Sequence, residues 1–284
     1  MGLTASVSPI SLGEGATPLV AAARLSAALG LDLHLKCEGL NPTGSFKDRG
    51  MVVAVERAAA SGARAVVCAS TGNTAASAAT YAARAGLEAV VLTPVGATAS
   101  AKRAQAKAAG ATVIEVRGSF DDALRLAFEL GEREGFVLVN SASPDHNRLE
   151  GQKLVAHEIV EQLGAPPDVI ALPYGGGGNV RAVALGLDEI GVSSRLVESG
   201  RLEVVTLAED DLRHWWEQLS SEEGVFCEPA SAAGVAALAK LGARDGRTTV
   251  ALITGHGLKD ADAVDQSSSA TVEATVEAIL EVLG

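Results

Sequence analysis

The 284 residues are enough for one large or two ordinary domains, and a content of 48% hydrophobic and 20% charged residues is typical of a globular protein. The formal net charge of −12 argues against a nucleic-acid-binding surface, because binding to phosphate backbones needs clustered Lys and Arg. Only 3% of the residues are aromatic, so the core must be built mainly from Ala, Val and Leu.

The three cysteines, Cys37, Cys68 and Cys227, indicate neither a disulfide framework nor a metal site, because their number is odd and their spacing matches no ligand motif. The first residues lack a basic segment followed by an apolar one, and no uncharged run is long enough to span a membrane. We therefore expect a cytoplasmic protein with no membrane contact and no bound metal.

In chain order, residues 31–37 alternate apolar and charged side chains, which predicts a strand with one solvent-exposed face. Residues 41–50 then read Asn-Pro-Thr-Gly-Ser-Phe-Lys-Asp-Arg-Gly, a loop that leads into a helix. Lys47 lies in the first turn of that helix, where the positive end of the dipole favours a neutral amine and a nearby anion. A neutral lysine can attack an aldehyde, although this stretch alone is also compatible with a surface lysine.

A unit of strand, polar turn and helix then repeats along the chain. It begins with a buried strand at residues 65–69, a polar turn at 70–74 and an Ala-rich helix that stops at Gly86. The next expected elements are strands at 88–93, 112–116 and 136–139 and helices at 100–109 and 120–134. This alternation predicts an α/β fold with mainly parallel sheets, whose ligands bind beyond the carboxyl ends of the strands.

A glycine-rich loop stands out in the second half. A helix pattern over residues 148–163 and a buried strand at 168–172 precede Pro-Tyr-Gly-Gly-Gly-Gly-Asn at residues 173–179, and another helix follows. Glycines between a strand and a helix let backbone N–H groups surround an anion, which predicts a phosphate-binding loop. The loop lacks the Lys-Ser/Thr ending of a nucleoside-triphosphate site, and a merely flexible loop is the alternative.

The remaining segments carry further expected elements. We expect a strand at 202–207, a helix at 209–219 and a strand at 249–253. Trp215 and Trp216 of that helix are expected to serve packing or an interface rather than to stack on a ligand. An amphipathic helix at 272–283 ends the chain. Polar motifs follow the carboxyl ends of four strands, at residues 70–74, 140–148, 173–179 and 254–260, so we expect them to converge on one site.

The combination of Ser-Phe-Lys-Asp-Arg, Ser-Thr-Gly-Asn-Thr, the glycine loop, Glu-Pro-Ala-Ser at residues 228–231 and Thr-Gly-His-Gly-Leu-Lys-Asp at 254–260 resembles the threonine synthase family. These are fold-type II pyridoxal-phosphate-dependent enzymes. The resemblance runs from residue 12 nearly to the end of the chain. It implies two three-layer α/β domains like those of the tryptophan synthase β subunit, a large one of residues 1–45 and 140–284 and a small one of 46–139.

The resemblance also implies site residues. Lys47 would form a Schiff base with pyridoxal 5′-phosphate and act as the general acid and base, and Asn73 and Thr254 would bind the 3′ oxygen and the ring nitrogen of the cofactor. The cofactor phosphate would be held by Gly175, Gly176, Gly177, Gly178 and Asn179. The candidates for substrate binding are Ser70, Thr71, Asn140 and Arg148.

The implied reaction converts O-phospho-L-homoserine and water to L-threonine and phosphate, a carbon–oxygen lyase reaction on an amino-acid substrate. Relatives are commonly homodimers. Two departures stand out: Gly176 replaces an Asn that contacts the substrate phosphate in the family, and the segment from Asn179 to Gly224 is much shorter than in relatives. The alternatives are therefore a serine/threonine dehydratase-type deaminase, whose phosphate loop is rich in glycine, and a non-catalytic paralogue.

Overall fold

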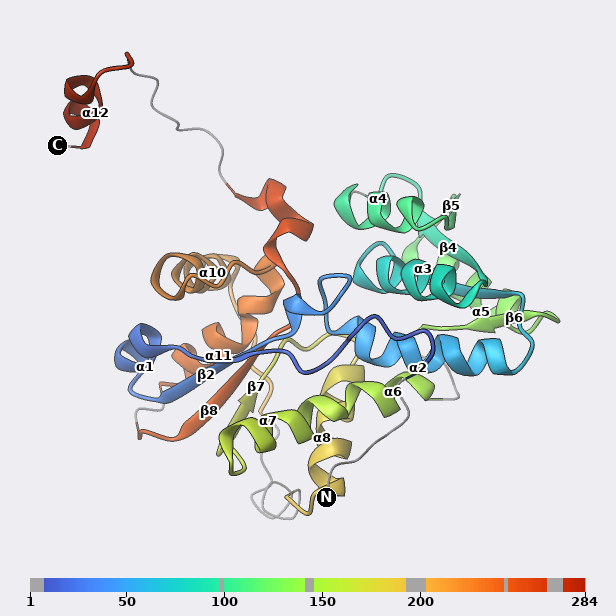
Figure 1. Cartoon of the computed structure of the whole chain (residues 1–284), viewed down its shortest axis with the longest axis horizontal. Coiled ribbons are helices and arrows are strands. Elements are labelled where there is room, and N and C mark those ends of the chain that lie inside the picture. Colours follow the sequence, from blue (N-terminus) through green and yellow to red (C-terminus); the bar gives the residue numbers. More distant parts are fainter. Residues whose placement is uncertain are drawn as a thin grey trace.

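Two parallel-rich sheets flanked by helices make up the chain in a computed structural model, which describes residues 8–97, 100–140, 146–192, 203–242, 245–264 and 273–283 (Figure 1). The predicted α/β class is confirmed. Every strand pair of the described residues is parallel except β1–β2. The boundaries of the two domains expected from the sequence remain a prediction.

The first sheet contains β1 (Leu19–Ala21), β2 (Asp32–Cys37), β8 (Thr248–Ile253) and β7 (Val169–Ala171), in that spatial order. Successive residues of β8 point to opposite faces. Val250 and Leu252 pack with α7 (Leu154–Leu163) and α8 (Gly178–Glu189). Ala251 and Ile253 belong to the cluster on the other face. That face is covered by α1 (Ala23–Leu29), α10 (Glu209–Glu223) and α11 (Ala233–Leu241).

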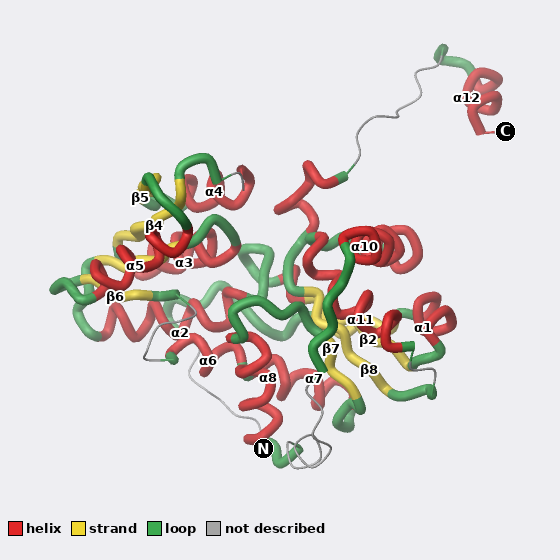
Figure 2. Tube along the Cα trace, turned by 180° about the vertical axis from the view of Figure 1, so that it is seen from behind, coloured by secondary structure: helices red, strands yellow, loops and turns green. Residues whose placement is uncertain are grey.

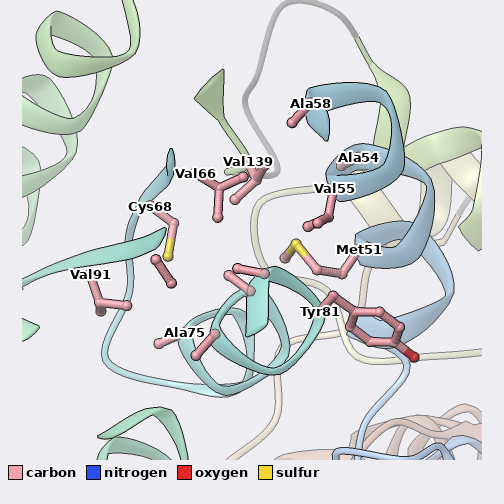
Figure 3. Packing of buried hydrophobic residues seen from close by; sticks show 14 of the residues in the cluster. Met51, Ala54, Val55, Ala58, Val66, Cys68, Ala75, Tyr81, Val91 and Val139 are labelled. Atoms are coloured by element: carbon pink, nitrogen blue, oxygen red, sulfur yellow. The ribbon is translucent and has the colours of Figure 1, made fainter. Parts of the chain in front are cut away.

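The second sheet contains β5 (Thr112–Val116), β4 (Glu88–Pro94), β3 (Ala65–Ala69) and β6 (Phe136–Leu138), in that spatial order. One face packs against α2 (Lys47–Ala60), α3 (Asn73–Ala85) and α4 (Ser100–Ala108). The other face packs against α5 (Phe120–Gly131). Met51 and Val55 of α2 lie in one cluster with Val66 and Cys68 of β3 (Figure 3). Small side chains dominate this core, as the composition predicts.

Helix α2 crosses α6 (Asn147–Gln152) at very short range, and glycines permit the contact. A Cβ atom on Gly151 would lie 1.7 Å from the carbonyl oxygen of Arg49, and one on Gly50 would lie 2.4 Å from that of Arg148. These separations are shorter than any contact that a methyl group tolerates. The crossing therefore holds the start of α2, with Lys47, close to Arg148.

Three parts of the fold differ from the sequence predictions. The helix predicted over residues 148–163 is divided at Lys153 into α6 and α7. The strand predicted at 202–207 is wrong, because residues 203–207 form no strand; residue 202 lies outside the described residues. Strand β1 and helix α1 are additional elements. Both are too short to produce a periodic pattern.

The remaining elements are η1 (Glu38–Leu40), η2 (Pro229–Ala232), η3 (Gly257–Ala263) and α12 (Val276–Leu283). Helix α12 lies away from both sheets (Figures 1 and 2). None of the helices described here combines the length and the apolar character needed to cross a lipid bilayer.

Candidate active site

A cavity of about 200 Å³ lies where the loops after β7 and β8 meet the start of α2. It is lined by Phe46, Lys47, Gln152, Pro173, Gly175, Gly176, Gly177, Gly178, Asn179, Val180 and Thr254. The sequence predicted that the motifs around Lys47, the glycine loop and Thr254 come together. The structure brings all three to this cavity.

Lys47 is the first residue of α2, and its ammonium nitrogen lies 4.3 Å from the centroid of the Phe46 ring. The pKa of Lys47 is lowered from 10.5 to about 7, mainly by burial and also by the Arg148 guanidinium, while the Glu228 carboxylate opposes both. Burial, rather than the helix terminus expected from the sequence, is the largest cause of this shift. The lowered pKa favours the neutral amine near neutral pH, which is the form that a nucleophile or a base requires.

The glycine loop connects β7 to the N-terminus of α8. Gly177 has a φ of +75° and precedes the first residue of α8, so a side chain there would be strained. Gly175 and Gly176 are exposed, and Cβ atoms on them would meet nothing within 4 Å. Exposed backbone at the start of a 12-residue helix can receive a phosphate group.

Thr254 follows β8, and a buried serine fixes its hydroxyl. Ser231 Oγ lies 3.0 Å from Thr254 Oγ1 and accepts a 2.9 Å hydrogen bond from the Gly255 N–H. Ser231 is fully buried. The Thr254 hydroxyl is therefore held at the cavity wall with few alternative rotamers.

Asn73 begins α3, and its side chain reaches across to the segment before η2. Its Nδ2 donates a 2.7 Å hydrogen bond to Glu228 Oε2. Its Oδ1 is buried without a hydrogen-bond partner among the described residues, as is Nδ2 of Asn179. Asn73 lies outside the lining of the cavity, although its partner Glu228 acts on Lys47.

The four candidates for substrate binding lie in different environments. Ser70 and Thr71 line a small separate hollow together with Arg103 of α4. The side-chain amide of Asn140 accepts a 2.8 Å hydrogen bond from the Ala69 N–H and donates a 2.9 Å hydrogen bond to the Ala69 carbonyl. Both of its polar atoms are thus bound to the end of β3. Arg148 is 4% exposed and donates to the Val139 carbonyl at 3.3 Å. Burial lowers its pKa to about 10, and it lies near Lys47.

Sequence reasoning assigned no role to several residues that the structure places at or beside the cavity. Phe46 and Gln152 line it, Ser231 holds Thr254, and Glu228 binds Asn73. Glu228 and Ser231 belong to the Glu-Pro-Ala-Ser motif. That motif contributed to the family resemblance, but the sequence indicated no physical role for its residues. Glu228 binds Asn73, which is 155 residues away in the sequence. Such a contact produces no periodic pattern in the sequence, so only the motif indicated that Glu228 matters.

These groups fit a planar, phosphorylated aldehyde such as pyridoxal phosphate. The cavity offers an amine with a lowered pKa, a helix terminus that can receive a phosphate group and a fixed hydroxyl. Asn73 Oδ1 and Asn179 Nδ2 are buried without hydrogen-bond partners in the described chain. Among these residues there is no cluster of His, Cys, Asp and Glu that could hold a metal ion.

Comparisons with known proteins give consistent results. The family model described as "Pyridoxal-phosphate dependent enzyme" matches residues 10–198. A threonine synthase of Synechocystis is 40% identical over 96% of this chain and 85% of its own length. One of Mycobacterium tuberculosis is 40% identical over 97% of this chain and 91% of its own length.

Two solved structures show the same fold at low sequence identity. O-ureido-L-serine synthase superposes with a TM-score of 0.79 at 22% identity, over 90% of this chain and 95% of its own. A hydrogen sulfide-producing enzyme from Fusobacterium nucleatum gives a TM-score of 0.77 at 22% identity, over 89% and 99% of the two chains. At this identity the likeness establishes the fold alone.

The aligned lengths reveal an internal difference. The alignment with the Synechocystis enzyme extends over 329 residues, whereas 96% of this 284-residue chain is about 273 residues. The relative therefore has more than about fifty residues inside the aligned span that this chain lacks. This agrees with a shortened segment, although its location between Asn179 and Gly224 remains a prediction.

Proposed function

Because the chain belongs to the pyridoxal-phosphate-dependent enzyme family, we propose that it is a threonine synthase, which converts O-phospho-L-homoserine and water to L-threonine and phosphate. The observation that carries this proposal is the match of curated threonine synthases to nearly the whole chain, with Lys47, whose pKa is lowered, at its cavity. The enzyme is a pyridoxal-phosphate-dependent carbon–oxygen lyase of amino-acid biosynthesis.

The cofactor would be held by the residues that converge on the cavity. The glycine loop and Asn179 would receive its phosphate, Thr254 its ring nitrogen and Asn73 its 3′ oxygen. When bound, pyridoxal phosphate withdraws electrons from the amino-acid substrate and so acidifies its Cα and Cβ protons. A hydroxyl partner such as Thr254 is neutral, so it does not keep the ring nitrogen protonated as a carboxylate would.

Lys47 is the proton carrier in this proposal. Its low pKa keeps the amine available as a base near neutral pH. Having accepted a proton, the same ammonium can return one to the substrate carbon, since it is anchored at the start of α2. Arg148 has a guanidinium suited to an anionic substrate group and lies near Lys47.

A second candidate function follows from the loop composition. Gly176 has no side chain to offer to a substrate phosphate, and a glycine-only loop favours a serine/threonine dehydratase-type deaminase. Such an enzyme releases a keto acid and ammonia instead of threonine and phosphate. The two reactions are separated by their products.

The test uses the purified full chain with added pyridoxal phosphate. We expect a visible absorbance band, borohydride fixation of the label on Lys47 and release of phosphate from O-phospho-L-homoserine. Lys47→Ala should lose the activity and retain the circular dichroism spectrum. Keto acid released from threonine without phosphate release would instead establish the deaminase, and the absence of any band would indicate a non-catalytic protein.

The proposal includes a cytoplasmic homodimer. The cytoplasmic location is supported by Cys37, Cys68 and Cys227, which are all buried free thiols. The dimer rests on its frequency among relatives, and light scattering of the purified protein measures it.

A further inference from the structure

A polar seam joins α4, next to the second sheet, to η3, next to the first sheet. Lys102 Nζ of α4 lies 2.7 Å from Glu228 Oε1 and 2.8 Å from Asp260 Oδ1. One turn further along α4, Gln105 accepts a 2.6 Å hydrogen bond from Lys259 of η3. Lys102 and Glu228 have side chains only 12% and 7% exposed, so solvent screens this pair much less than a surface ion pair.

The seam continues into the candidate active site through Glu228. One carboxylate oxygen meets Lys102, and the other accepts the hydrogen bond from Asn73. Glu228 also lies against the backbone beside Thr254, because a Cβ on Gly255 would be 1.7 Å from its Oε2. The carboxylate therefore touches Asn73 and the segment after Thr254 while it is held by a lysine from α4.

We infer that Glu228 is a positioning residue of the active site, which orients Asn73 and favours the charged form of Lys47, and that Lys102 holds Glu228 in place where α4 packs against η3. The inference rests on the proposed function, which gives Asn73 and Lys47 their tasks. Because its Nδ2 faces the carboxylate, the Asn73 amide has one fixed orientation, and its unpartnered Oδ1 must point elsewhere.

The electrostatic part of the inference has a definite sign. Glu228 favours the charged form of Lys47, and Lys102 offsets the charge of Glu228. The other charged groups around the pair are Lys259 and Asp260 on η3, Asp48 on α2 and Arg148 on α6. Removing the charge of Glu228 should lower the pKa of Lys47, and removing that of Lys102 should raise it.

The test measures uptake of pyridoxal phosphate by the cofactor-free full chain as a function of pH. Capture needs the neutral amine of Lys47, so the pH midpoint of the initial rate of visible-band formation reports its pKa. Relative to the unmodified chain, we expect Glu228→Gln to lower this midpoint and Lys102→Met to raise it, each by on the order of half a pH unit. Lys102→Arg keeps the positive charge, so its midpoint should match that of the unmodified chain. Lys107 is an exposed lysine on the same helix, and Lys107→Met should leave the midpoint unchanged.

The outcomes separate this inference from the proposed function. Unchanged midpoints in both variants, or shifts in the same direction, would overturn it even if the variants lose thermal stability. Uptake with opposite shifts but without phosphate release would support the positioning role and reject threonine synthase activity. No uptake by the unmodified chain would overturn both.

Discussion

At the scale of single residues, the proposed chemistry depends on Lys47, whose pKa the fold lowers. Burial of Lys47 disfavours its ammonium form, which would serve the proposed catalysis but costs stability in the cofactor-free chain. Because the folded pKa of about 7 lies below the unfolded value near 10.5, the unfolded state binds more protons between these pH values. The contribution of Lys47 to folding is therefore most unfavourable below pH 7 and fades as the pH rises toward 10.5.

Lys47→Met in the cofactor-free chain should accordingly raise the melting temperature at pH 7 by several degrees, since the penalty removed is on the order of a few kcal/mol. The gain should shrink steadily between pH 7 and pH 10. Calorimetry or circular dichroism over this pH range measures it, with Lys107→Met as the control. A loss of stability at pH 7 would show that Lys47 has a structural role in the empty site.

Gly176 is the position where substrate choice can be tested directly. A side chain fits there, because a Cβ would meet nothing within 4 Å and the backbone φ lies outside the left-handed region. Gly176→Asn should lower KM for O-phospho-L-homoserine severalfold, since its amide adds a donor for the substrate phosphate. Steady-state phosphate release measures this, and Gly176→Ala separates the amide from the added volume. An unchanged KM would mean that the substrate phosphate binds elsewhere.

At the scale of elements, the repeating strands and helices were predictable because each has a period and a Gly or polar turn after it. The glycine loop and the start of α2 were also predictable, since glycines and a lysine next to a helix terminus have a local signature. The division of α6 from α7 and the loop at 203–207 were not predictable. Glu228, Lys102 and Ser231 act through contacts distant in sequence, which no local pattern reports.

The crossing of α2 and α6 shows how such long-range geometry determines the site. Gly151→Ala should destabilise the chain by about 3 kcal/mol or more, because its methyl group would overlap the Arg49 carbonyl and force the helices apart. Denaturant unfolding of the cofactor-free chain measures the loss. Gly175→Ala, with open space around its Cβ, should be close to neutral. Equal effects of the two variants would mean that the crossing relaxes without cost.

At the scale of the whole molecule, the notable property is that Lys47, the glycine loop and Thr254 line one cavity in a chain shorter than its Synechocystis relative. Strand β7 has β8 as its neighbour and otherwise lies at the edge of the first sheet as described. The residues that follow it, Tyr174, Gly175 and Gly176, are exposed. The glycine-loop side of the cavity is thus open to solvent in the described structure, whereas Lys47 is only partly exposed.

This asymmetry predicts weak retention of the cofactor. The charge of a phosphate bound at a solvent-exposed loop is screened, and the phosphate exchanges with water more readily than one enclosed by protein. The covalent attachment at Lys47 must therefore supply most of the binding free energy of the cofactor. During dialysis the visible band should therefore disappear faster from this chain than from the longer Synechocystis threonine synthase under the same conditions. Added inorganic phosphate should accelerate the loss, because it competes for the exposed loop. Equal retention by the two proteins would show that another part of the chain, or a second copy, closes the site in solution.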